Sequence, residues 1–183
     1  MKKLMLLGGS RYLLSVIETA HKLGIYVITC DYLPDNTAHK FSDEYINVSI
    51  IDKEKVLEFL NDAKVWYLAT VDDEGNPHVR PFGAQAILDD KLYIQTGLKK
   101  NVAKQMLAHP QVEISGMAEG KWIRLEATVV HDDRVEQEAR FLDAVPSLKK
   151  MYAAGDGNTA IFYLKDAHAT ICSFTEAPET YDF

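Results

Sequence analysis

The first 52 residues alternate between strand-like and helix-like patterns. Three continuous apolar runs are typical of buried strands: KLMLL (3–7), IYVITCD (25–31) and YINVSII (45–51). Between the first two runs, RYLLSVIETAHKL places apolar residues at helical spacing, and Gly24 follows where a helix commonly ends. The segment between the second and third runs predicts irregular structure with at most one helical turn. This order predicts a small, Rossmann-like parallel β–α–β unit.

From Lys53 onward the pattern changes. The first 52 residues have the runs of buried parallel strands, whereas the later residues have short strand-like runs separated by turn signals, as is typical of antiparallel strands. KEKVLEFLNDA (53–63) has the spacing of an amphipathic helix. Seven strand-like runs follow it, separated by turn signals such as DDEGNP: VWYLATV (65–71), HVRPFGAQAIL (78–88), KLYIQT (91–96), QVEISGM (111–117), KWIRLEATVVH (121–131), TAIFYLK (159–165) and HATICSFT (168–175). Two helical segments, RVEQEARFLDAV and PSLKKMY, lie among them. We therefore expect an α+β fold with a closed or nearly closed antiparallel barrel in residues 53–183, after a first domain in residues 1–52.

Composition narrows the choice of partners and of compartment. The 183 residues are 47% apolar, enough to bury a core, and the net charge of −7 argues against nucleic acid or an anionic membrane as the main partner. The N-terminal apolar run is too short for a signal sequence or a membrane span. Neither the two cysteines nor the six histidines have metal-ligand spacing. We expect a soluble, cytoplasmic protein with no bound metal.

Arg80 is the most informative single residue. Strict alternation in HVRPFGAQAIL puts Arg80 on the same face as Phe82, Ala84 and later apolar residues, where an unpaired guanidinium is costly to bury. We therefore expect an anionic partner for Arg80. Pro81 and Gly83 interrupt the ladder and predict a bulge or a place where a ligand approaches the backbone. The alternative is an edge strand whose Arg80 pairs with a surface carboxylate.

Lys99 and Lys100 stand at the predicted start of a short helix, where the partial charge of the helix dipole is also positive. A bound anion would turn this repulsion into a binding site, since backbone N–H groups also point outward there. Together with Arg80 and a close glycine turn, the lysines indicate a phosphate site. The alternative is a solvated turn in which Asn101 caps the helix and both lysines point into water.

Four motifs in the second half follow one another in a characteristic order: VLEFLNDAKVWYLATVDDEGNPHVRPFG, KLYIQTGLKKNVAKQMLAHPQVEISG, GKWIRLEATVV and PSLKKMY. Through them, residues 54–180 resemble the pyridoxamine 5′-phosphate oxidase-like family of split barrels. This resemblance implies a homodimer that binds FMN at its interface. The last residues, SFTEAPETYDF, lack the arginine motif with which the true oxidases hold the substrate phosphate. Pyridoxamine phosphate is therefore not implied as the substrate.

The resemblance also implies site residues. It assigns the FMN phosphate to Arg80 and Lys100, with Lys99 as a further candidate. A set of strand residues would line the flavin: Pro81, Phe82, Gly83, Gln95 and Thr96. Trp122 falls where a side chain of the partner subunit approaches the flavin in such proteins.

Residues 1–52 resemble a different protein, the pre-ATP-grasp domain that opens ATP-grasp enzymes, with its Gly-Gly-Ser turn after the first strand. The nucleotide-gripping domains of those enzymes have no counterpart in this sequence, so ligase activity is not implied. A competing hypothesis is dinucleotide binding, because Gly8 and Gly9 follow one strand and Asp31 ends the next. The full G-x-G-x-x-G pattern is not met.

Two functions remain open from the sequence. One is an FMN-dependent oxidoreductase that acts on an unidentified small substrate, with a nicotinamide as candidate electron donor. Flavin chemistry requires orientation of the cofactor rather than a catalytic triad, and no catalytic residue is assigned. The other is a flavin-binding protein without turnover, used for storage, sensing or assembly.

Overall fold

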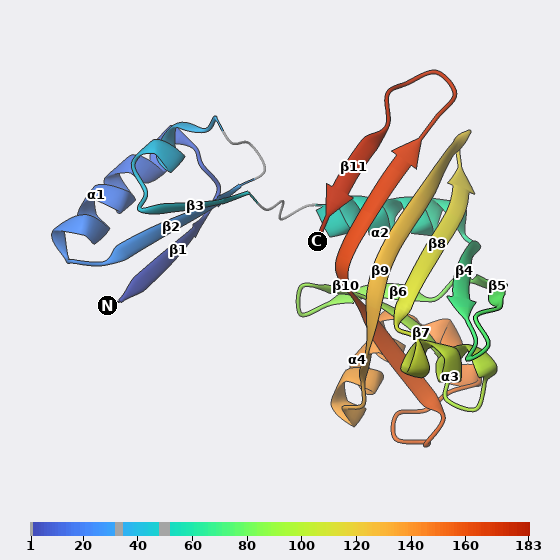
Figure 1. Ribbon diagram of the computed structural model, residues 1–183. Coiled ribbons are helices and arrows are strands. Elements are labelled where there is room, and N and C mark those ends of the chain that lie inside the picture. The colour runs from blue at the N-terminus through green and yellow to red at the C-terminus, as the bar shows by residue number, and fades with distance from the viewer. Residues whose placement is uncertain (1, 32–34, 48–51) are drawn as a thin grey trace. The chain divides into compact units, whose positions relative to one another are not determined.

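The computed structural model describes residues 2–31, 35–47 and 52–183, and Figure 1 shows the course of the chain. The chain forms two compact units, Met1–Ile51 and Asp52–Phe183. Across the described ranges, every helix is too short or too polar to span a bilayer.

The first unit is a parallel sheet with strand order β1-β2-β3, as the sequence predicts. Its elements are β1 (Lys3–Leu7), η1 (Arg11–Leu13), α1 (Leu14–Lys22), β2 (Tyr26–Asp31), η2 (Thr37–Lys40) and β3 (Glu44–Asn47). Ile17 and Ala20 of α1 pack against Val27 of β2, which gives the unit a small core of its own. Of the predicted strand 45–51, positions 48–51 lie outside the described residues.

The second unit is built on an eight-stranded sheet with the order β5-β4-β8-β9-β10-β7-β6, and β11 pairs with β10. All of its described strand pairs are antiparallel, as expected for a split barrel. Its strands are β4 (Trp66–Val71), β5 (Pro77–Phe82), β6 (Gln85–Leu88), β7 (Lys91–Gly97), β8 (Gln111–Ala118), β9 (Lys121–Asp132), β10 (Thr159–Cys172) and β11 (Glu179–Asp182). Its helices are α2 (Asp52–Ala63), α3 (Asn101–Ala108), α4 (Val135–Ala144) and η3 (Pro146–Lys150).

Two strand predictions were wrong in their extent. The predicted strand 78–88 is two strands, because the chain leaves β5 after Phe82 and enters β6 at Gln85. β5 pairs with β4 and β6 pairs with β7, at opposite ends of the strand order. Conversely, the run 159–165 and the run 168–175 as far as Cys172 form the single strand β10, whose pairing with β9 shifts register between Lys165 and His168. β11 had no counterpart in the predicted elements.

The main core lies between the sheet and the apolar faces of α2 and α3. Trp66 and Leu68 of β4 and Ile94 of β7 are fully buried in it. α3 contributes Val102 and Met106 and contacts β4, β7 and β9. This packing holds the start of α3 beside the ends of β5 and β7, where the candidate site lies.

Candidate functional site

A pocket of about 210 Å³ lies where β5, β7, the start of α3 and the segment after α4 meet. Seven of the nine sequence-predicted site residues line it: Arg80, Pro81, Phe82, Gly83, Gln95, Thr96 and Lys100. The others that line it were not predicted: Ala84, Val102, Leu148, Met151 and Tyr152. The pocket therefore has a cationic side, from Arg80 and Lys100, and an apolar wall.

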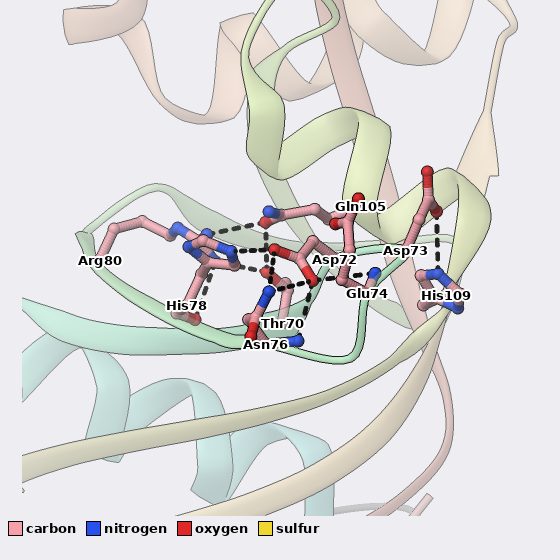
Figure 2. Close-up of polar contacts among 9 residues, drawn as sticks. All are labelled: Thr70, Asp72, Asp73, Glu74, Asn76, His78, Arg80, Gln105 and His109. Carbon is pink, nitrogen blue, oxygen red and sulfur yellow. Dashed lines mark hydrogen bonds and ion pairs between the residues drawn. The ribbon is translucent and has the colours of Figure 1, made fainter.

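Arg80 is half-buried and held only by neutral acceptors (Figure 2). Its Nη1 donates to the Thr70 hydroxyl at 2.6 Å and to the His78 carbonyl at 3.1 Å. Its Nη2 donates to Gln105 Oε1 at 2.8 Å. None of the ion pairs among the described residues includes Arg80, so the expected anionic partner is not supplied from these parts of the chain. Burial lowers the pKa of Arg80, as expected for a cation without a countercharge.

The apolar face predicted around Arg80 does not continue along one strand. Arg80 and Phe82 share a face of β5, but Ala86 and Leu88 belong to β6, which pairs with a different neighbour. Strict alternation could not foresee this, because it assumes one continuous strand and the strand breaks after Phe82. The predicted interruption is found at Gly83, where the chain has left β5, whereas Pro81 pairs with Tyr67 in an unbroken register without a bulge.

Lys100 occupies the N-cap position of α3, with φ −80° and ψ 146° and no side-chain cap. In the alternative of a solvated turn Asn101 would cap the helix, but Asn101 is instead its first helical residue. Lys100 lines the pocket, and its Nζ lies 5.8 Å from the centroid of the Tyr152 ring. Both lysines are exposed, but Lys99 does not line the pocket; its backbone N–H donates to Asn158 Oδ1 at 3.1 Å. Lys100 therefore lines the pocket and Lys99 does not, although the sequence indicated both for one phosphate site.

Gln95 and Thr96 are the polar part of the pocket that β7 provides. Both are buried, with 5% and 3% of their surface exposed. The Gln95 amide donates to the Thr96 carbonyl at 2.6 Å, which fixes its orientation within the strand. β7 therefore offers an ordered polar edge to the pocket.

Trp122 does not line this pocket. It lies near the start of β9, opposite Met117 and Cys172, and its ring packs at 5.0 Å from that of Phe174. The sequence-based assignment placed Trp122 against the flavin of a partner subunit, and that assignment stays a prediction.

The apolar wall of the pocket comes from η3 and the residues after it, Leu148, Met151 and Tyr152. The motif PSLKKMY was part of the family resemblance but was not assigned to the site. Its residues lie more than 60 positions from Arg80 in the sequence, and no local period links the two segments. Only the family resemblance of PSLKKMY could have indicated that this segment lines the pocket.

The β4–β5 turn carries a second polar cluster beside Arg80 (Figure 2). The Asp72 carboxylate accepts hydrogen bonds from His78 Nε2 at 2.8 Å and from the backbone N–H of Asn76 at 2.8 Å. These bonds, that from His78 above all, hold the pKa of Asp72 well below its usual range. Asp72 is thus engaged in stabilising the turn.

In the first unit, the Gly-Gly-Ser turn is packed against the chain itself. A Cβ at Gly9 would overlap with the imidazole of His39, and the Asp31 carboxylate accepts a hydrogen bond from the Asn36 amide at 2.6 Å. The turn and the acid that motivated the dinucleotide hypothesis therefore both contact side chains of the same unit. The hypothesis gains no support from this geometry.

Comparison with known proteins gives a family match for the second unit. The family model described as pyridoxamine 5′-phosphate oxidase matches residues 52–169. The chain is similar to the crystal structure of a NimC/NimA family protein from Clostridium acetobutylicum, with 44% identity, 75% of this chain and 96% of that chain covered, and a TM-score of 0.72. A comparison with curated proteins found no match.

More distant structures share the fold. The General Stress Protein 26 from Bacillus anthracis is 18% identical, with 72% of this chain and 98% of that chain covered and a TM-score of 0.57. A heme binding protein from Mycobacterium smegmatis is 15% identical, with 75% of this chain and 59% of that chain covered and a TM-score of 0.57. The family model begins at residue 52, so the resemblance of residues 1–52 to ATP-grasp enzymes stays a prediction.

Proposed function

The chain belongs to the pyridoxamine 5′-phosphate oxidase family, and from this premise we propose that its second unit binds FMN through the pocket at Arg80 and Lys100. The observation that carries the proposal is the unbalanced charge of the pocket. Arg80 is half-buried and has only neutral partners, and Lys100 lines the same pocket. The phosphate of FMN would supply the missing countercharge through charge-assisted hydrogen bonds.

The size of the pocket supports a binding site completed by a second subunit. Its 210 Å³ is smaller than the roughly 300–1,000 Å³ of pockets that enclose a whole small ligand. A single chain would therefore hold the phosphate end of FMN, and a homodimer would cover the flavin ring, with Trp122 as the candidate contact from the partner. An isologous contact would complete both sites at once.

We propose an oxidoreductase function for this site. FMN, when bound, accepts and donates hydride or single electrons, so the chain itself must bind and orient it. The described residues that line the pocket include no carboxylate, histidine or cysteine, so no acid–base pair is assigned. The apolar wall of Leu148, Met151 and Tyr152 would exclude water beside the polar edge of β7. We propose a small substrate and a nicotinamide electron donor as its reaction partners.

A flavin-binding protein without turnover is the second candidate, because the described lining would bind and orient a cofactor whether or not it turns over. Steady-state assays of the purified holoprotein with NADH and NADPH separate the two. Bleaching of the flavin followed by repeated turnover supports the oxidoreductase. Failure of every nicotinamide to reduce the flavin supports the binder.

The phosphate site is tested by titrating FMN and riboflavin, which lacks the phosphate, into variant proteins. Arg80→Ala and Lys100→Glu should each weaken FMN binding by at least about tenfold, because a charge-assisted contact contributes about 1.5–3 kcal/mol. Riboflavin binding should change much less.

Lys99→Glu is the matched control, since it makes the same change of charge one residue outside the pocket lining. It should weaken FMN binding clearly less than Lys100→Glu does. Equal, small losses for FMN and riboflavin in both pocket variants would refute the phosphate site.

A further inference from the structure

Thr70 and Gln105 surround the Arg80 guanidinium with neutral oxygen atoms. We infer that they are positioning residues for anion binding, which hold Arg80 at the pocket while leaving its charge available to the phosphate. The inference rests on the proposed FMN site and adds two residues that do not themselves line the pocket.

The three side chains form a closed triangle of hydrogen bonds (Figure 2). Arg80 donates to both Thr70 Oγ1, at 2.6 Å, and Gln105 Oε1, at 2.8 Å. The Thr70 hydroxyl in turn donates its proton to Gln105 Oε1 at 2.7 Å. The hydroxyl proton is therefore committed to Gln105, and only a lone pair faces Arg80. Thr70 is 3% exposed, so its hydroxyl is shielded from water.

The triangle fixes Arg80 without neutralising it. A glutamate at position 105 would have nearly the same shape as Gln105 but would place a carboxylate against the guanidinium. The same hairpin carries three carboxylates, and none of them forms a described ion pair with Arg80: Asp72 is held by His78 and the Asn76 backbone, Asp73 contacts His109, and Glu74 is exposed. The sequence thus has a neutral amide at the position where an acid would remove the charge that an anion needs.

Gln105 also links the two cationic elements of the pocket. α3 begins immediately after Lys100 and carries Gln105 on its second turn. The hydrogen bond from Arg80 to Gln105 therefore ties β5 to α3, and with it sets the separation of Arg80 and Lys100. A phosphate bound between them requires that this separation be constant.

The decisive experiment is Gln105→Glu, measured by titration of FMN and riboflavin into the full chain. We expect FMN binding to weaken by at least about tenfold, because the new carboxylate competes with the phosphate for Arg80, and riboflavin binding to change by less than about twofold. Lys104→Gln is the matched control. It changes the net charge by the same amount at an exposed neighbouring position on α3, and should weaken FMN binding by less than about threefold.

A second pair of variants tests Thr70. Thr70→Val keeps the shape of the side chain but removes the hydroxyl, and we expect about three- to tenfold weaker FMN binding. Thr70→Ser retains the hydroxyl and should restore most of the affinity. Circular dichroism of each variant verifies that it is folded.

The possible results are distinguishable. If Gln105→Glu and Lys104→Gln weaken FMN binding equally, or if Gln105→Glu weakens riboflavin as much as FMN, the positioning role is wrong while the phosphate site can still stand on Arg80→Ala. If the unaltered protein binds FMN no more tightly than riboflavin, both the proposed site and this inference are overturned.

Discussion

Two charged side chains of the second unit, Asp132 and Arg80, differ in whether a described side chain of opposite charge pairs with them. Asp132 is 7% exposed and accepts hydrogen bonds from Arg134 Nε at 2.9 Å, Arg134 Nη2 at 2.7 Å and the Tyr93 hydroxyl at 2.9 Å. Arg80, by contrast, has no carboxylate partner among the described residues. A compensated charge of the first kind contributes to stability, whereas an uncompensated one of the second kind is suited to bind a ligand.

Asp132 predicts a pH dependence of stability. The hydrogen bond from Arg134 is the largest cause that lowers the pKa of Asp132 from 3.8 to about 2. Because the folded-state pKa is the lower one, the stabilisation is complete above about pH 4 and is lost as the pH falls toward 2. Asp132→Asn should therefore reduce the free energy of unfolding by about 1–2 kcal/mol at pH 7 and by much less near pH 2. Denaturant unfolding at several pH values measures this.

Asp133→Asn, at the exposed neighbouring position, is the control for this experiment. It should leave the pH profile of the original protein nearly unchanged. A constant difference between Asp132→Asn and the original protein from pH 7 to pH 2 would contradict the assigned role of Asp132.

At the scale of elements, the packing of β8 against α2 and β4 supports the strands that lead to the pocket. Gly116 of β8 lies opposite Trp66 of β4, and a Cβ there would lie 3.1 Å from the Trp66 Cβ and 3.5 Å from the Ala63 Cβ. Trp66 Nε1 donates to Gln85 Oε1 at 2.8 Å, which ties β4 to the first residue of β6. The small residue at 116 thus permits the close approach of three elements.

Gly116→Val should destabilise the protein by about 1–3 kcal/mol, because the added methyl groups require space that Trp66 and Ala63 occupy. Chemical denaturation measures the change. Ser115→Val is the matched control, since residue 115 is exposed and a β-branched residue suits a strand. Its effect should stay within about 0.5 kcal/mol. Similar losses for the two variants would show that valine destabilises β8 at either position. Crowding at Gly116 would then not be the cause.

At the scale of the whole molecule, every residue that lines the candidate pocket belongs to the second unit. A fragment starting at Asp52 should therefore fold, bind FMN within about threefold of the affinity of the full chain, and have the mass of a dimer. Flavin titration, circular dichroism and light scattering measure the three properties. A folded fragment that binds no flavin would show that residues 1–51 contribute to the site. A monomer with flavin bound would refute the proposed shared site.

The elements of this protein were largely determined by its sequence alone. Runs of apolar residues predicted β1, β2 and β7 nearly to their ends, and alternation predicted β4, β8 and β9, because these patterns reflect which faces of a strand are buried. The cations Arg80 and Lys100 could be proposed as one site because each stands in a local context, a strand face or a helix start, that makes an isolated charge unfavourable. Local chemistry is sufficient for inferences of this kind.

The tertiary structure decided what depends on the path of the chain. The arrival of Tyr152 at the pocket brings together residues far apart in sequence, and the separation of β5 from β6 depends on the strand order of the whole sheet, so no local period specifies either. The sequence predicted an anionic partner for Arg80, which stays a prediction, but it did not indicate Thr70 and Gln105, 10 and 25 residues away, which hold the guanidinium. Which atoms surround a half-buried charge depends on register and helix packing, and these are set only when the whole core assembles.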